Sequence, residues 1–426
     1  MFRIKGLIRS SDLPAEYHKN FTHLYADMGW FGVLSGSSLA FLSVYAARLG
    51  ANSFQIGLLG AMPAVINLFF AIPASQWLQN RTIGRAVFWT SVFYRFGYLL
   101  LIPLPWLFGN DHQIWVLILL ALLMGIPGTA LAVGFNALFA EAVPEQWRAH
   151  VAGTRNILLS IVYVITSIGC GAILNHVPFP IGYQIVFGIG FLGAAMSSYH
   201  LFFIRSLAGS KSQGSVEEAI TIENNESRPT RFKIFKQIRL SSLRMDILQT
   251  PFRRTLLVLL FFHLAQYLTI PLFPMYFVNV LHLNDQQIGI GTASFYLTVL
   301  IGSSQLARLC NKIGLRKVTG IGVSLMSLYP ILLSYSSGFL QYLVISLVGG
   351  FSWALVGGAL ANYLLEKIPN QDRTAYLAWY NIILNAAILA GSLLGSSIGE
   401  RIGLGTALFI FGIVRLVSGL AILKWG

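Results

Sequence analysis

The sequence contains few charged residues for its length. Asp, Glu, Lys and Arg make up 10% of its 426 residues, whereas 55% of the residues are hydrophobic. A soluble domain has about 25% charged residues. Because so few charged side chains could not cover a water-soluble globule, we expect lipid to solvate most of the chain.

Sequence motifs for common enzyme chemistry are also missing. The two cysteines, Cys170 and Cys310, fall in different expected helices near opposite membrane faces, so neither a disulfide nor a metal site is predicted. The sequence has no HExxH or P-loop motif, which argues against a zinc protease and an ATP-driven pump. Residues 1–19 lack the apolar core of a cleavable signal peptide. We therefore expect no enzyme activity, no cofactor and no cleaved leader.

Long apolar runs are what the sequence does contain, and each is long enough to cross about 30 Å of hydrocarbon as a helix. They predict an all-α membrane protein with twelve transmembrane helices in two groups of six. The expected spans are 29–48, 55–78, 85–107, 113–140, 151–174, 181–204, 254–280, 286–309, 316–335, 339–365, 373–399 and 403–424.

A polar stretch at residues 141–160 occurs a second time at residues 366–385, a constant shift of 366 − 141 = 225. Each copy ends one apolar run and begins the next. The matching positions are Glu141, Pro144, Gln146, Arg148, Asn156 and Ile157 with Glu366, Pro369, Gln371, Arg373, Asn381 and Ile382. This duplication predicts two structural repeats that superpose by rotation about an axis along the membrane normal.

The positive charges lie mainly in the loops on one side of the expected helices, with Arg48 and Arg401 as the exceptions. That asymmetry places these loops, both chain termini and the linker in the cytoplasm, and it accounts for the net charge of +14 without a nucleic-acid partner. The predicted parts are a cytoplasmic segment 1–28, bundles 29–204 and 254–426, and a cytoplasmic linker 205–253. A basic amphipathic stretch in the linker lies either on the inner leaflet or against the protein.

This organisation resembles the major facilitator superfamily, whose loop after the second helix of each half reads G-x-x-x-D-R-x-G-R-R. The glycine and the basic residues of this motif have counterparts here, but asparagine replaces the acid and cannot form an ion pair. The corresponding loop residues are Asn80, Arg81, Gly84 and Arg85 in the first half and Asn311, Lys312, Gly314 and Arg316 in the second. The resemblance implies alternating access, a cavity lined by the first, fourth, seventh and tenth spans, gating by these loops, and a monomer.

Candidate pathway residues are polar groups on the spans that the resemblance assigns to the cavity. His263, Gln266 and Tyr267 share one face of the seventh span; alternatively, the histidine is satisfied by a neighbouring helix. Ser35, Ser38 and Tyr45 share a face of the first span, and Asn136 lies with Thr129 on the fourth. Small polar residues also serve as packing contacts between membrane helices.

The remaining charged residues near the spans allow two interpretations. Glu141 and Glu366 end spans and either pair with Arg148 and Arg373 of the loops or carry protons. No Asp or Glu is expected near the middle of a span, and Asp27 is predicted to cap the first span or to act in a gate.

Two arginines are expected in mid-span. Arg95 and Arg415 either bond to an adjacent helix or bind an anionic substrate, with no acid expected beside them.

The leading hypothesis is a secondary transporter of a small organic solute across the cytoplasmic membrane. Its coupling ion would be a proton, although facilitated diffusion is also open. The alternative is a membrane assembly or pigment-delivery factor on the same scaffold, which a fully apolar centre would favour. Its partners would be the solute and the lipid bilayer.

Overall fold

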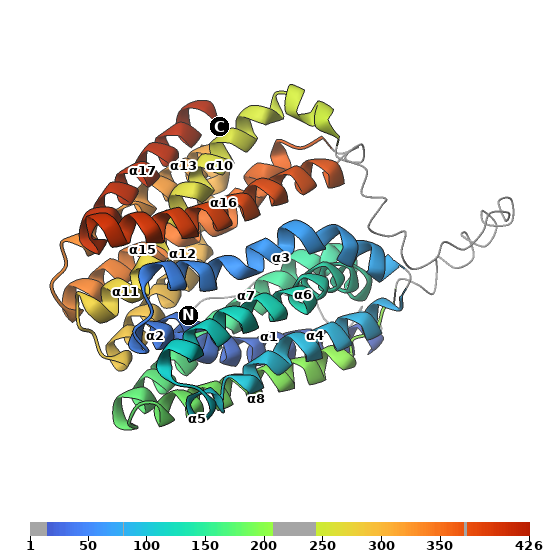
Figure 1. The fold of residues 1–426 in the computed structure, drawn as a ribbon. Coiled ribbons are helices and arrows are strands. Elements are labelled where there is room, and N and C mark those ends of the chain that lie inside the picture. The colour runs from blue at the N-terminus through green and yellow to red at the C-terminus, as the bar shows by residue number, and fades with distance from the viewer. Residues whose placement is uncertain (1–14, 80, 208–243, 370–372) are drawn as a thin grey trace, which may run out of the picture.

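The computed structural model describes residues 15–79, 81–207, 244–369 and 373–426. Asn80, most of the linker and its basic amphipathic stretch lie outside the described residues. All the elements that the described residues form are helices (Figure 1). They are α1 (Ala15–Leu34), the π-helix η2 (Ser35–Leu39), α2 (Ala40–Arg48), α3 (Ser53–Gln79), α4 (Ile83–Leu100), α5 (Leu104–Leu107), α6 (Asn110–Ala142), α7 (Glu145–His176), α8 (Ile181–Phe202), the 3₁₀ helix η5 (Met245–Gln249), α10 (Phe252–Thr269), α11 (Leu272–Asn279), α12 (Asp285–Ile313), α13 (Leu315–Met326), α14 (Leu328–Ser334), α15 (Phe339–Glu366), α16 (Arg373–Ile402) and α17 (Leu404–Trp425).

The predicted all-α membrane architecture is confirmed. Within the described residues, eleven helical segments are long and apolar enough to cross a membrane. The twelfth is α4, whose 18 residues span about 27 Å at 1.5 Å per residue. Its composition is less apolar because it carries Arg85 and Arg95.

Two helix boundaries follow directly from local sequence. Asn52 and Gln55 exchange two side-chain–backbone hydrogen bonds at the start of α3, and Asn284 and Gln287 make the same two bonds at the start of α12. These reciprocal caps satisfy amide groups that a helix start leaves free, and they stand at equivalent places in the two halves. The seventh span breaks at Pro271, between α10 and α11, because proline removes a backbone donor.

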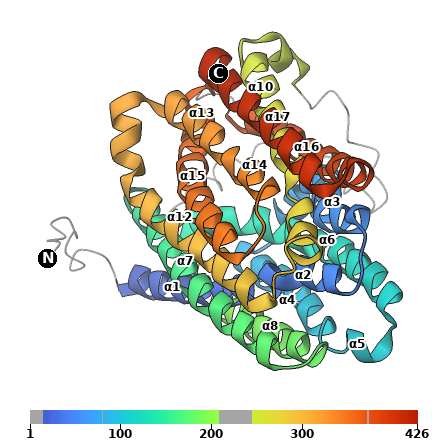
Figure 2. The ribbon, with the colours of Figure 1, turned by 90° about the vertical axis from the view of Figure 1, so that its left-hand side faces the viewer.

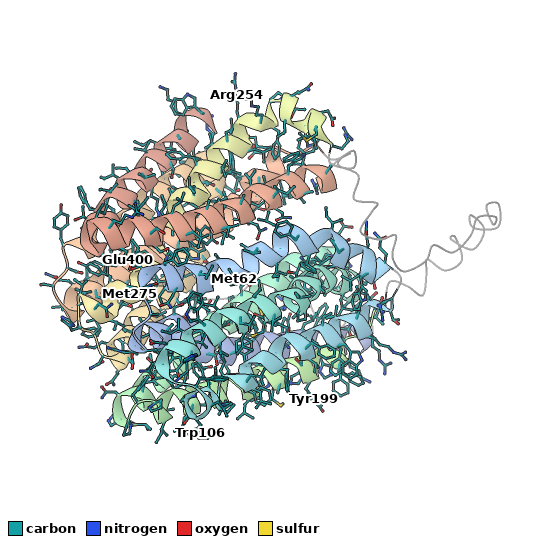
Figure 3. The ribbon with its side chains drawn as sticks, in the orientation of Figure 1. Met62, Trp106, Tyr199, Arg254, Met275 and Glu400 are labelled. Carbon is teal, nitrogen blue, oxygen red and sulfur yellow. The ribbon has the colours of Figure 1, made fainter. Side chains whose placement is uncertain are left out.

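The helices form two bundles, α1–α8 and α10–α17, which meet along two pairs of helices (Figures 1 and 2). Helix α3 packs against α16, and α7 packs against α12. The largest cluster of buried apolar side chains includes residues from both bundles, among them Met62 and Met275 (Figure 3). Trp106, which is 74% exposed, points away from the first bundle, as expected for a surface solvated by hydrocarbon.

The bundles are tied together at one end of the molecule. We call this end the far face, because the linker joins the helix ends on the opposite side, the linker face. At the far face, the Arg48 guanidinium lies 3.1 Å from the Asp285 carboxylate and donates to the Leu283 carbonyl. Nearby, Ser167 donates to the Gly289 carbonyl at 3.2 Å. These contacts join the end of α2 and the second half of α7 to the start of α12.

The first helix begins much earlier than its hydropathy indicates. The expected span begins at residue 29, whereas α1 begins at Ala15. Its polar first half is stabilised by packing, because Phe21 and Leu24 belong to a buried cluster with residues of α6, α7 and α8. Asp27 is therefore 27 − 15 = 12 residues inside the helix, about 18 Å from its start. The prediction that Asp27 caps the first span is wrong.

Candidate functional site: a charged cavity in the first bundle

A cavity of about 540 Å³ lies inside the first bundle. Its wall is formed mainly by α1, α3, α4 and α6, and α7 and α8 contribute Arg155 and Leu201. The π-helix η2 interrupts the first span and adds Leu39 to the wall. A volume of this size is in the range of small-molecule sites.

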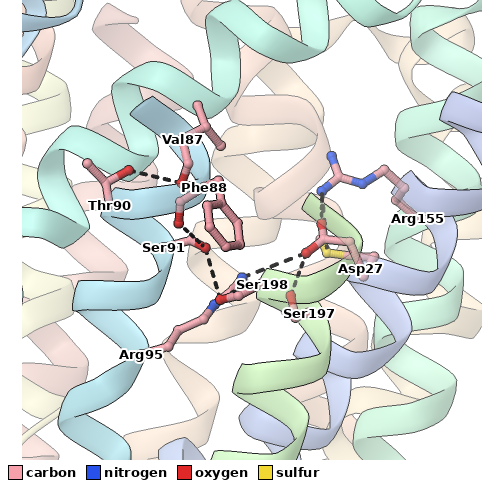
Figure 4. Close-up of polar contacts among 10 residues, drawn as sticks. Asp27, Val87, Phe88, Thr90, Ser91, Arg95, Arg155, Ser197 and Ser198 are labelled. Carbon is pink, nitrogen blue, oxygen red and sulfur yellow. Dashed lines mark hydrogen bonds and ion pairs between the residues drawn. The ribbon is translucent and has the colours of Figure 1, made fainter. Parts of the chain in front are cut away.

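Three charged side chains lie together at the wall of this cavity (Figure 4). One carboxylate oxygen of Asp27 lies 3.2 Å from Arg155, and the other lies 3.7 Å from Arg95. The exposed fractions are 3% for Asp27, 5% for Arg95 and 8% for Arg155. These residues come from α1, α4 and α7, so the cluster exists only once the bundle has assembled.

Three serines complete the polar network. Ser197 of α8 donates to the Asp27 carboxylate, and Arg95 donates to the Ser198 hydroxyl at 3.0 Å. The Ser91 hydroxyl donates to Ser198 at 2.9 Å. Figure 4 shows this chain of contacts running from α4 through α8 to Asp27. The network orients both arginines, because each already bonds at one end of its guanidinium group.

The formal charges of the cluster do not balance. Among the residues that line the cavity, Asp27 supplies one negative charge, whereas Arg95 and Arg155 supply two positive charges. The Nε atoms of both arginines are buried and have no hydrogen-bond partner in the described part of the chain. An excess positive charge in a low-dielectric interior is costly unless an anion compensates it. The site can therefore attract an anion.

The rest of the wall is largely apolar and aromatic. The Arg155 guanidinium lies 4.4 Å from the ring centre of Phe135. The Tyr94 and Tyr98 hydroxyls are 3.0 Å apart. An apolar body could therefore lie against these groups while a charged end meets the arginines.

A second polar group connects the cavity to the other bundle. Thr129 of α6 donates to the side-chain oxygen of Asn67 at 2.6 Å, and both residues line the cavity. The Asn67 amide donates in turn to Asn385 of α16 at 3.2 Å. A molecule that displaced Asn67 would therefore disturb a contact between the bundles.

The pathway candidates of the seventh span lie in the second bundle, away from this cavity lining. His263 is buried, and its Nε2 atom is 3.1 Å from the Tyr380 hydroxyl of α16. Gln266 is also buried, and its backbone carbonyl accepts a hydrogen bond from Arg415. Tyr267 is partly buried.

The candidates of the first and fourth spans are separated from one another. Ser35 and Ser38 are buried in η2. Tyr45 donates to the Gln113 side chain at 2.5 Å, near the far face. Asn136 is exposed on α6 and is not among the residues that line the cavity, whereas Thr129 is.

The loop candidates lie at the linker face. Arg81 lies over the Trp77 ring at 4.5 Å, and Arg316 donates to the Gly426 carbonyl at 3.2 Å. Gly314 has a φ of 85° between α12 and α13, a conformation that favours glycine. Gly84 and Arg85 lie in the first turn of α4, and Asn311 and Lys312 in the last turn of α12.

The two glutamates and their neighbouring arginines are also at the linker face. Arg148 donates to the carbonyls of Ala140 and Val143 rather than to Glu141, because it caps the end of α6. Glu141 accepts a hydrogen bond from Ser206. Glu366 ends α15 and Arg373 begins α16.

Sequence reasoning named Asp27 and Arg95 separately but missed Arg155 and the contacts that bring the three residues together. The expectation that Arg95 has no acid beside it is wrong, because α1 brings Asp27 next to it. Arg155 did not stand out as a candidate in the sequence, because it lies among the polar residues of the duplicated stretch 141–160. A usable signal was there: the shift 380 − 155 = 225 pairs Arg155 with Tyr380, so this position changes from arginine to tyrosine between the repeats.

Comparison with known proteins agrees with this architecture. Residues 255–426 match the family model described as Major Facilitator Superfamily. The structure of the nucleoside transporter NupG aligns with 95% of this chain and 98% of its own, with a TM-score of 0.65 and 13% identity. The second half of the chain therefore matches the model of this superfamily, and the chain as a whole has the fold of a solved transporter.

Other transporters align over different lengths. The cis,cis-muconate transport protein of Acinetobacter baylyi is 23% identical over 300 residues, 67% of each chain. The quinolone resistance protein NorA of Staphylococcus aureus is 23% identical over 133 residues, 31% of this chain and 34% of NorA. A bacterial homologue of the lysosomal transporter Spinster, solved inward-facing and unoccupied, aligns with 97% of this chain at a TM-score of 0.66 and 12% identity.

Proposed function

We propose that this protein is a member of the major facilitator superfamily and a secondary transporter that moves a small organic solute across the cytoplasmic membrane by alternating access. The observation that carries the proposal is the charged cavity lined by membrane helices. An assembly or pigment-delivery factor would be favoured by a fully apolar centre, and Asp27, Arg95 and Arg155 argue against that alternative. A relative that transports muconate supports a small solute.

Under the same proposal, the structure corresponds to one conformation of the alternating-access cycle. The contacts of Arg48 with Asp285 and of Ser167 with Gly289 hold the far face closed. If the linker face is cytoplasmic, as the Lys and Arg distribution favours, this state faces inward. The inward-facing Spinster homologue has a similar fold, which supports this assignment.

We further propose that His263 and Tyr380 form the second bundle's part of the pathway. They join α10 to α16, while Asp27 and Arg155 join α1 to α7 in the first bundle. Tyr380 is the repeat counterpart of Arg155, so the two pairs occupy related places. An imidazole can accept a proton as well as bond to a hydroxyl group, which makes His263 a candidate for substrate or proton binding. The linker-face loops would act as gates.

Uptake by purified protein in proteoliposomes tests this function. A panel of labelled organic acids, nucleosides and cationic drugs would be offered with and without an inward-directed proton gradient. We expect saturable uptake of at least one solute above the level of empty liposomes, and acceleration by the gradient if protons are coupled. Absence of uptake for the whole panel, from protein whose bundles still interconvert, would favour the assembly-factor alternative.

A further inference from the structure

We propose that the cavity of the first bundle binds an organic monocarboxylate, with its carboxylate held by Arg155 and Arg95. This inference rests on the proposed transport function. It adds the charge of the bound molecule, which the transport function by itself does not specify. It follows from the charge, the geometry and the chemistry of the cavity wall.

Charge selects the class of ligand. The cluster carries a net charge of +1 from two arginines and one aspartate. A monoanion would bring this charge to zero, whereas a cation would be repelled and an uncharged molecule would leave the excess charge uncompensated. A dianion would leave an excess negative charge unless Asp27 took up a proton.

Geometry provides donors for a carboxylate. Each guanidinium group is fixed by the protein, Arg155 through Asp27 and Arg95 through both Asp27 and Ser198. The buried Nε atom of each also lacks a partner in the described residues, so the protein itself leaves part of each guanidinium group unsatisfied. Arginine presents several N–H donors in one plane and suits carboxylates better than lysine does.

The remaining wall indicates the body of the ligand. Phe31, Phe135 and Tyr94 line the cavity with several leucines, so a small apolar or aromatic body would lie against them. The polar pair Asn67 and Thr129 also reaches the cavity and could bond to a single hydroxyl or carbonyl group. A monocarboxylate with a compact apolar body therefore fits both ends.

The test measures binding separately from transport. Purified protein in lipid nanodiscs is dialysed against radiolabelled benzoate and phenylacetate, and against benzamide, phenylacetamide and benzylamine, with empty nanodiscs subtracted. We expect saturable binding of at least one carboxylate and at least tenfold weaker binding of its amide. Failure of both carboxylates to bind, or amides that bind equally well, would overturn the proposal.

Variants locate the site. We expect Arg155→Gln and Arg95→Gln each to weaken carboxylate binding about tenfold to a hundredfold, and Arg155→Lys to weaken it less than Arg155→Gln. Arg415→Gln is the matched control, since it removes a buried arginine from the second bundle. The affinity of this variant for the carboxylate should match that of the wild type. Carboxylate binding that survives both cavity substitutions in protein that elutes as the wild type does on gel filtration would refute the assignment.

For Asp27→Asn we predict preserved or stronger anion binding, the opposite of the effect of the arginine substitutions. A misfolded variant could not give this result. Asparagine is nearly isosteric with aspartate, but the substitution raises the net charge of the cluster to +2. The variant should bind benzoate at least as tightly as the wild type and should gain affinity for the dianion cis,cis-muconate. A loss of binding for both anions would contradict the charge argument.

The outcomes distinguish this proposal from the proposed function. If a carboxylate binds with the expected dependence on the arginines but no solute enters proteoliposomes, the anion site stands and the transport function fails. If an uncharged or cationic solute is transported while neither carboxylate binds, the transport function stands and the anion site fails.

Discussion

Three buried arginines in this membrane protein have different surroundings, and their surroundings separate structural from functional roles. Arg415 donates from α17 to the Gln266 carbonyl and the Thr269 hydroxyl of α10, so it joins two helices of one bundle. Arg95 and Arg155 instead share one carboxylate and line a cavity. A guanidinium group beside a cavity can exchange partners with a bound molecule, whereas one between packed helices cannot do so without separating them.

At the residue scale, His263→Gln tests the proposed pathway in the second bundle. Glutamine preserves size and hydrogen-bonding capacity toward Tyr380 but does not titrate. We expect the variant to fold and to change the rate, the affinity or the pH dependence of uptake, measured as initial rates between about pH 5.5 and 8. Tyr380→Phe is the companion variant, because it removes the contact and keeps the imidazole.

If His263→Gln transports with unchanged rate, affinity and pH dependence, the residue is structural. The contact with Tyr380 would then be the helix–helix hydrogen bond that the alternative interpretation requires.

At the scale of elements, the far face is closed by one ion pair between α2 and α12. The side chains of Arg48 and Asp285 are 27% and 12% exposed, so the pair is partly screened and should contribute on the order of 1 kcal/mol. We expect Asp285→Asn to shift the population about fivefold toward a state open at the far face. The measurement is the distance between spin labels at the exposed positions Asp111 and Ser337, one in each bundle.

Asp246→Asn controls for the loss of a carboxylate, because Asp246 pairs with Arg244, two residues away in the chain. The label distance should not change in this variant. A double variant with Arg48→Gln should shift the population by less than the sum of the two single variants, with any shift beyond Asp285→Asn due to the lost bond from Arg48 to the Leu283 carbonyl. Fully additive shifts would mean that the two residues act separately.

Close packing of α3 against α16 also closes the far face. A Cβ atom at Gly57 would lie 2.5 Å from the Ser392 carbonyl oxygen, which is backbone and cannot move aside easily. Gly57→Val should therefore separate the bundles at this face, at a cost of about 1–3 kcal/mol, and lengthen the distance between labels at positions 111 and 337. Gly60→Val is a matched control on the same helix, since a Cβ there meets nothing within 4 Å.

If Gly57→Val and Gly60→Val gave the same label distances, the packing of α3 against α16 would not control the separation of the bundles at the far face. In that case the contacts at the far face would be permanent, and alternating access by separation of the bundles at this face would be ruled out.

At the scale of the whole molecule, the testable property is the orientation of the linker face in the membrane. The Lys and Arg distribution predicts that the linker face is cytoplasmic. A cysteine at the exposed position Ser206, in a background with Cys170 and Cys310 replaced by serine, should react with an impermeant maleimide in inverted vesicles and not in intact cells. A cysteine at Ser337 should behave in the opposite way, and the reverse pattern would invert the topology.

The sequence by itself determined the twelve helices and much of their local geometry. Lipid solvates each apolar run separately, so a helix forms wherever local composition is apolar for long enough. Caps such as Asn284 with Gln287 and the break at Pro271 depend on residues that are close together in the chain. These features could therefore be predicted from short stretches of sequence, and the duplication added that there are two halves.

Only the tertiary structure decided the site. Asp27 is polar, and hydropathy places it outside the membrane; its burial depends on Arg155, 128 residues later, and on Ser197, 170 residues later. A charge inside a bundle is tolerated because partners on other helices compensate it, and local composition carries no information about those partners. For the same reason, the sequence could identify Arg95 as unusual, but packing had to bring an acid and a second arginine beside it.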